Sequence, residues 1–87
     1  MAKKITLKSG KKATLKEMSV DNFDECMDAV RFEEVDGQSI IKNQFGLSTL
    51  WIRNGIEKAD DKYIKTLSIN DRVELQLAIQ EYNSLGE

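Results

Sequence analysis

Histidine and proline are absent from this 87-residue sequence, and cysteine and tryptophan each occur once. The lack of histidine removes the commonest general base, and with a single cysteine it leaves no set of zinc ligands. The lone Cys26 excludes an internal disulfide, is typical of a reducing cytoplasm, and reads best as a small core residue. Without proline the chain has neither a cis-proline turn nor a proline-rich linker. These absences favour a protein that is not an enzyme and that uses no cofactor and no metal.

Long apolar runs are also missing. No stretch approaches the roughly 18–20 consecutive apolar residues of a membrane span, and the opening Met-Ala-Lys-Lys leads into a strand pattern, not a signal peptide. Hydrophobic residues make up 40% of the chain and charged residues 32%, which is normal for a globular protein. We therefore expect one domain over residues 1–87, with a small core, in the cytoplasm and away from membranes.

The net charge of −2 hides a separation of charge along the chain. Residues 1–16 hold six lysines and no acid, whereas residues 17–36 hold eight acids and one base. Charge separated in this way steers a partner or a second copy of the chain, although a merely solvated surface is the alternative. The lysine run has no interleaved aromatics or arginines, which argues against nucleic acid as the partner.

The amino-terminal pattern predicts a β-hairpin over residues 4–16. Apolar residues alternate with Thr and Lys on both sides of a turn at Ser9-Gly10. Because a two-stranded hairpin is marginal alone, its apolar face, which includes Ile5, Leu7 and Leu15, must lie on helices.

Three helices are predicted after the hairpin, over residues 20–31, 39–54 and 69–83. Each begins after a serine suited to the N-cap, and these are Ser19, Ser39 and Ser68. A break of the second helix at Gly46 is left open, because glycine costs about 1 kcal/mol relative to alanine inside a helix. Residues 56–65 are expected to be a polar connector, and Gly86 to close the chain. The fold class is therefore α+β, with an N-terminal β-hairpin packed on about three helices and helix dominating.

Two of the predicted helices are apolar on two sides, which is typical of elements that are central to a fold or buried against a partner. The last helix carries one row at Ile69, Val73 and Leu77 and a second row that runs from Leu75 to Tyr82. As candidate partner contacts we take six residues, each with ordinary core packing as its alternative: Leu47, Leu50, Trp51, Leu75, Ile79 and Tyr82.

Four segments together resemble the small tail assembly chaperones of long-tailed bacteriophages, and the resemblance covers most of the chain. They are the strand pair 5–16, a Met-Ser-Val-x-x-Phe helix start at 18–23, a Leu-x-x-x-x-Gly-Ile segment at 50–56, and a Leu-Ser-x-x-Asp helix start at 67–71. The resemblance implies no catalysis. It implies a factor in the host cytoplasm that binds the long helical tape-measure protein and keeps it soluble for tail assembly. It also implies that Gly86-Glu87 ends a short form, beside a longer form made by frameshifting.

Two alternatives remain open at this point. A small structural virion protein of the neck, the tail-completion region or the baseplate would use the separated charge to form a ring, with the lysine hairpin of one copy against the acidic helix of the next. A small factor that inhibits a host enzyme or touches nucleic acid is supported by the lysine run alone. The sequence contains no phosphate-cradling glycine pattern and no nucleophile elbow, so an enzyme is the least favoured class.

Overall fold

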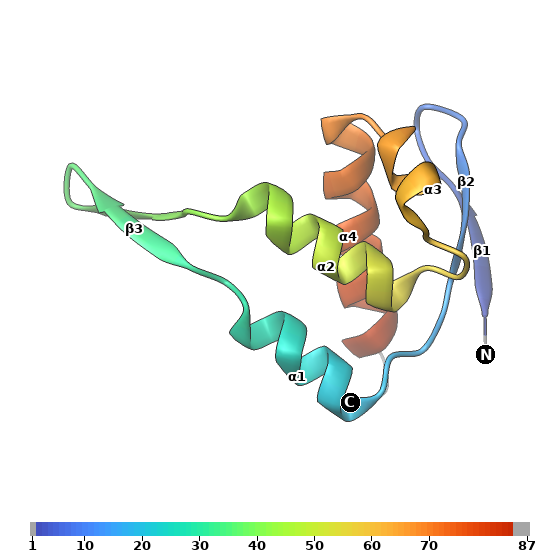
Figure 1. Cartoon of the computed structure of the whole chain (residues 1–87), viewed down its shortest axis with the longest axis horizontal. Helices are drawn as coiled ribbons and strands as arrows, with labels where there is room; N and C mark the ends of the chain where they lie inside the picture. Colours follow the sequence, from blue (N-terminus) through green and yellow to red (C-terminus); the bar gives the residue numbers. More distant parts are fainter. Residues whose placement is uncertain (1, 85–87) are drawn as a thin grey trace.

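The computed structural model describes residues 2–84 and has the α+β fold that the sequence predicts, with a two-stranded hairpin at the amino terminus (Figure 1). The described residues form two separate antiparallel hairpins and four helices. In chain order the elements are β1 (Lys3–Thr6), β2 (Lys12–Leu15), α1 (Val20–Asp28), β3 (Phe32–Val35), β4 (Gln38–Ile41), α2 (Gln44–Gly55), α3 (Asp61–Lys65) and α4 (Ile69–Ser84).

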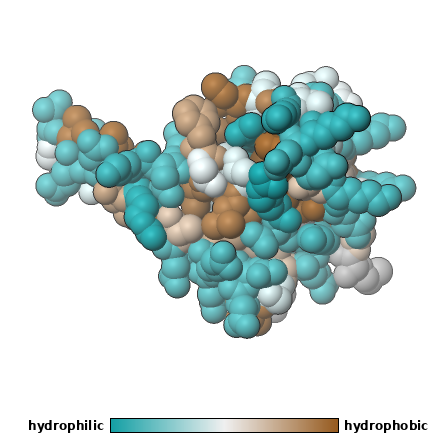
Figure 2. Space-filling view, viewed as in Figure 1, coloured by the Kyte–Doolittle hydropathy of each residue, from teal (hydrophilic) through white to brown (hydrophobic). Residues whose placement is uncertain are grey.

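The second hairpin, β3–β4, projects away from the rest of the molecule, and we call residues 31–42 the arm (Figure 1). Asp36 and Gly37 form its turn with φ angles of 53° and 79°, the pair of positive values that a tight two-residue hairpin turn requires. Every residue of the arm is exposed. Figure 2 shows apolar atoms on the arm among hydrophilic ones, and its exposed large apolar residues are Phe32, Val35, Ile40 and Ile41.

The arm corrects the predicted start of the second helix. Ser39 is not an N-cap: it lies in β4 opposite Glu34, and the helix begins only at Gln44. The Asp36-Gly37 turn folds residues 38–41 back onto 32–35, so their backbone groups pair across the hairpin and are not free to start a helix. The helix then continues through Gly46 without a break.

Asn43 holds the base of the arm closed. Its side-chain amide donates to the carbonyl oxygen of Ala29 (2.9 Å) and its side-chain oxygen accepts from the N–H of Arg31 (2.9 Å). The Arg31 guanidinium also donates to the carbonyl oxygen of Asp28, the last residue of α1 (2.9 Å). These bonds satisfy backbone groups at the end of the helix. α1 therefore ends at Asp28, before the predicted end at Arg31.

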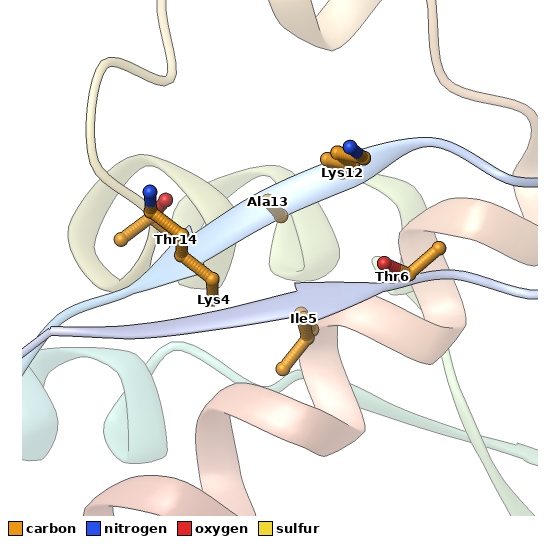
Figure 3. A pocket seen from close by; sticks show the side chains of 6 residues that line it. All are labelled: Lys4, Ile5, Thr6, Lys12, Ala13 and Thr14. Carbon is orange, nitrogen blue, oxygen red and sulfur yellow. The ribbon is translucent and has the colours of Figure 1, made fainter.

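The amino-terminal hairpin has the predicted turn, with Gly10 at a φ of 93°. Its inner face is apolar, and its outer face carries Lys4, Thr6, Lys12 and Thr14 (Figure 3). Residues 55–57 extend the hairpin along the far edge of β2, because the N–H of Lys16 donates to the Gly55 carbonyl oxygen (3.0 Å) and that of Glu57 to the Thr14 carbonyl oxygen (2.9 Å).

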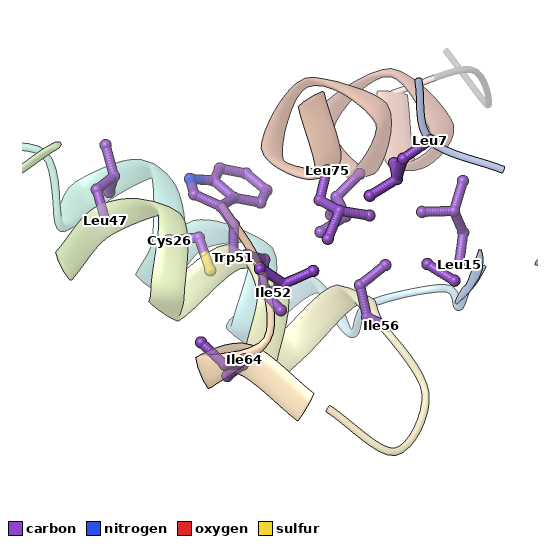
Figure 4. Packing of buried hydrophobic residues seen from close by; sticks show 12 residues of the cluster. Leu7, Leu15, Cys26, Leu47, Trp51, Ile52, Ile56, Ile64 and Leu75 are labelled. Atoms are coloured by element: carbon purple, nitrogen blue, oxygen red, sulfur yellow. The ribbon is translucent and has the colours of Figure 1, made fainter. Parts of the chain in front are cut away.

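The core lies where α2 crosses α4 under the inner face of the amino-terminal hairpin (Figures 1 and 4). Trp51, Ile52 and Leu75 point into it from the two helices, and Leu7 and Leu15 close it from the hairpin. Cys26 is buried in the same cluster, as expected of a small core residue. This packing leaves α1 and the arm on one side and the lysine-rich hairpin on the other (Figure 1).

The predicted connector at residues 56–65 contains a short helix, α3, that the sequence did not indicate. Asp60 is its N-cap, and its side chain accepts from the Tyr63 N–H at 2.8 Å. Five residues are too few for a visible apolar period, which is why the pattern looked like a turn. The last helix begins at Ile69 as predicted, and Gly86 lies outside the described residues.

Candidate functional site: an apolar row on the last helix

The six predicted contact residues lie mostly inside the protein. Four of them are between 0% and 5% exposed, and these are Leu47, Trp51, Leu75 and Ile79. Leu50 and Tyr82 are partly buried and pack against the same core. The alternative interpretation, ordinary core, therefore holds for the four buried residues, and they cannot reach a partner while the protein is folded.

The opposite row of α4 is the one that faces solvent. Ile69 and Leu77 are each 60% exposed, and Val73 between them is partly buried. These residues follow one another at i, i+4 and i+8, so they form a continuous ridge along one side of the helix. The prediction that α4 is apolar on two sides was correct, and the structure shows that Leu75 and Ile79 serve the core while Ile69 and Leu77 do not.

A shallow groove of about 610 Å³ runs beside this ridge, between α4 and the turn of the amino-terminal hairpin. Val73 and Leu77 form its apolar part, and Lys8 and Glu74 form part of its polar rim. The backbone N–H of Lys8 donates to both carboxylate oxygens of Glu74, at 3.2 and 3.3 Å. The hairpin turn is thereby held against the helix, and the groove has fixed walls.

Asp71 anchors the same turn from a nearly buried position, 3% exposed. Its carboxylate accepts from the Ser9 hydroxyl at 2.7 Å and from the Ser68 N–H at 3.1 Å, while the Ser68 hydroxyl accepts from the Asp71 N–H at 3.1 Å. The last two bonds form a reciprocal cap at the start of α4. The hydrogen bonds from Ser9 and from the Ser68 backbone hold the pKa of Asp71 below its ordinary value.

The Cys26 thiol and the Tyr63 hydroxyl are partly or fully buried and are hydrogen-bonded within the protein. Burial raises the pKa of the Cys26 thiol, with the Glu25 charge adding to the effect and the Asn54 side chain opposing it. Burial also raises the pKa of Tyr63, whose hydroxyl donates to the Lys12 carbonyl oxygen (3.0 Å). Within residues 2–84, no three His, Cys, Asp or Glu side chains are placed to hold a metal ion.

The exposed apolar ridge and the adjoining groove make α4 suited to binding an apolar surface.

Two features outside the candidate site are not predicted from the sequence: the arm and the role of Asn43 at its base. The arm was signalled by Asp36-Gly37, a strong hairpin turn, but the segments on either side of it lack strict alternation because both of their faces meet solvent. The role of Asn43 had no signal, because its partners are brought to it by the folding of the arm.

No family model matches this chain, and neither the curated proteins nor the solved structures contain a match. These comparisons neither support nor refute the resemblance to tail assembly chaperones. In the part of the chain that the structure describes, no helix is long and apolar enough to cross a membrane.

Proposed function

We propose that this chain is a non-enzymatic protein-binding factor that acts during assembly of a bacteriophage tail. In this proposal it works in the cytoplasm of the host cell, where it binds the helical tape-measure protein, and it needs no cofactor. The observation that carries the proposal is the apolar ridge on α4, where Ile69 and Leu77 are exposed and Val73 between them is partly buried. The identity of the partner comes from the resemblance in the sequence.

The ridge suits a helical partner for a geometric reason. Side chains at i and i+4 pack into the grooves of a facing helix, so an amphipathic helix laid on α4 would cover Ile69 and Leu77 together. Burying two such side chains from their exposed state contributes about 1–2 kcal/mol each. The adjoining groove, with Lys8 and Glu74 at its rim, offers polar groups that would fix the orientation of the bound helix.

Co-expression tests this function directly. An amphipathic segment of a phage tape-measure protein should be insoluble when expressed alone, and soluble and co-purified when expressed with the wild-type chain. A segment that stays insoluble in the presence of the folded wild-type chain, and is not retained by it in a pull-down, would contradict the proposal.

A structural virion protein is the second candidate, favoured by the separation of charge in space. The lysines of β1 and β2 lie at one end of the molecule, and Glu33, Glu34 and Asp36 lie on the arm at the other (Figure 1). Such a protein would form a ring or oligomer within the neck, tail-completion region or baseplate. Mass spectrometry of purified particles separates the two candidates, because an assembly chaperone should be missing from the mature particle and a virion protein should be present in stoichiometric amounts.

A further inference from the structure

Among the described strands, β1, β3 and β4 each have an edge with no neighbouring strand, whereas residues 55–57 cover the far edge of β2. β4 (Gln38–Ile41) carries no charged residue, so the two charged open edges are those of β1 and β3. In the β1–β2 pair the N–H of Leu7 donates to the Lys11 carbonyl oxygen (2.8 Å), so odd-numbered residues of β1 bond to β2. The N–H and C=O groups of Lys4 and Thr6 therefore point away from β2. The side chains of Lys4 and Thr6 lie on the outer side of the hairpin in Figure 3.

The arm has the same kind of edge at β3. The N–H of Lys42 donates to the Arg31 carbonyl oxygen (2.7 Å), so odd-numbered residues of β3 bond to β4. The backbone groups of Phe32 and Glu34 consequently point outward, and all four residues of β3 are exposed. An exposed edge of this kind is a template for another strand.

We propose that β3 of one copy pairs antiparallel with β1 of a second copy, which makes a four-stranded sheet in the order β4–β3–β1–β2 across the two chains. The occupant of the β1 edge is thus the oppositely charged β3 edge of another copy, and the edge of β4 stays at the end of the sheet. When a strand is added to a sheet edge in this way, main-chain hydrogen bonds provide affinity and side-chain contacts determine which strand binds.

The charges of the two edges fit one register. Antiparallel pairing requires outward-pointing residues to face each other, and setting Lys4 opposite Glu34 meets this requirement. The same register places Glu33 diagonally across from Lys3 on the other face of the sheet. Opposite charges at direct and diagonal positions stabilise a strand pair. All four side chains are exposed in the single chain and are free to make these contacts.

The same charges oppose pairing of like edges. Two β1 strands would bring their lysines into direct or diagonal contact, and two β3 strands would do the same with Glu33 and Glu34, which is destabilising. The lysines on β1 thus protect that edge against a second β1 while leaving it open to β3. Specificity arises from both attraction and repulsion.

The two edges lie at opposite ends of the molecule, whose longest dimension is 40 Å (Figure 1). Contact between different surfaces at opposite ends is head-to-tail, and it continues into a ring or an open chain without closing as a simple dimer. This self-association would give the second candidate function a defined contact. It does not depend on the ridge of α4, so it stands or falls separately from tape-measure binding.

Charge reversal on each edge tests the proposal. Sedimentation velocity of the wild type, at concentrations from about 10 µM to about 1 mM, should show oligomers that grow with concentration and dissociate at high salt. Either E33K/E34K or K3E/K4E alone should weaken association about tenfold or more. An equimolar mixture of the two variants should restore it, because the reversed arm of one variant then meets the reversed β1 of the other.

The matched control for E33K/E34K is D24K/E25K, which makes the same change of net charge at two exposed positions of α1. It should associate like the wild type. Far-UV circular dichroism of every variant checks that loss of association is not caused by unfolding. The proposal is overturned if the wild type stays monomeric over the whole concentration range. It is also overturned if the control loses association as the edge variants do, or if the mixture fails to restore it.

Discussion

The indole of Trp51 is the largest side chain that the protein buries completely, at 1% exposure. Its ring meets that of Phe23 from α1 edge to face, with centroids 5.5 Å apart and planes at 82°. The contact links α1 to α2. Trp51 extends from α2 toward α4 (Figure 4). Trp51 therefore holds three helices together through one side chain.

Replacing Trp51 by alanine should lower the free energy of unfolding by about 3–5 kcal/mol, the usual cost of removing a large aromatic side chain from a core. A chain of this length has about 4–13 kcal/mol in total, so the variant should be near its folding limit. Urea unfolding followed by far-UV circular dichroism measures the change. The control is F45A, which truncates a side chain that is 58% exposed and should cost less than about 0.5 kcal/mol. Equal losses in both variants would contradict the assigned core.

Asp71 gives the stability of the protein a defined dependence on pH. Because its pKa is lowered in the folded state, the folded chain binds this proton more weakly than the unfolded chain. Its contribution is therefore complete above the ordinary carboxyl pKa of about 3.9 and is lost as the pH falls below that value. The Ser9 and Ser68 hydrogen bonds are the cause.

The D71N variant should consequently have a lower denaturation midpoint than the wild type at neutral pH, and the gap should narrow below about pH 3.9. Chemical unfolding curves at a series of pH values from 7 to 2 would show this. A gap that stays constant over that series would show that the charge of Asp71 has no part in holding the hairpin turn to α4.

At the scale of elements, the two glycines of α2 differ in what surrounds them. A Cβ atom at Gly46 would meet nothing within 4 Å, whereas one at Gly55 would lie 2.9 Å from Ile79 Cγ1 and closer still to Cγ2. Gly55 is the point at which α2 packs tightly on α4, and the absence of a side chain there allows the two helices to approach.

Alanine at these two glycines should change stability in opposite directions. G46A should stabilise the protein by up to about 1 kcal/mol, since alanine is the better helix former. G55A should destabilise it by about 1–3 kcal/mol, since the added methyl overpacks the contact with Ile79. Thermal or urea unfolding of the pair measures both effects, and a loss in G46A equal to that in G55A would contradict the helix packing described above.

Burial explains why the amino-terminal hairpin and α4 could be predicted from the sequence and the arm could not. The amino-terminal hairpin and α4 were predicted because Leu7, Leu15, Leu75 and Ile79 carry the period of a structure with one face in a core. The arm was missed because both of its faces meet solvent, which leaves no period to read. Its apolar residues Ile40 and Ile41 then seemed to extend the helical pattern of α2.

For the candidate site, the sequence predicts only that α4 is apolar on two sides. The sequence shows two apolar rows on that helix, but it does not show which row faces the core. That choice depends on how α4 lies against α2 and the hairpin, which involves contacts as distant in sequence as Ser9 with Asp71. The sequence prediction names Leu75 and Ile79 as contacts, and the structure buries both and leaves Ile69 and Leu77 exposed.

At the scale of the whole molecule, the surfaces proposed for binding lie on separate elements around one core: the ridge on α4, the basic edge of β1 and the acidic edge of the arm. The first suits an apolar helix, and the other two suit each other. Their positions on separate elements mean that variants can affect one surface and leave the others intact.

Affinity for a labelled amphipathic segment of the tape-measure protein, measured with variants of exposed residues, tests the proposed function most directly. The I69S/L77S variant should bind about thirty-fold more weakly than the wild type, because it removes about 2 kcal/mol of apolar contact. V20S/M27S, which changes two exposed apolar residues of α1, should bind like the wild type. Equal affinity of I69S/L77S and V20S/M27S, with both variants folded, would contradict the assignment of the α4 ridge as the binding surface.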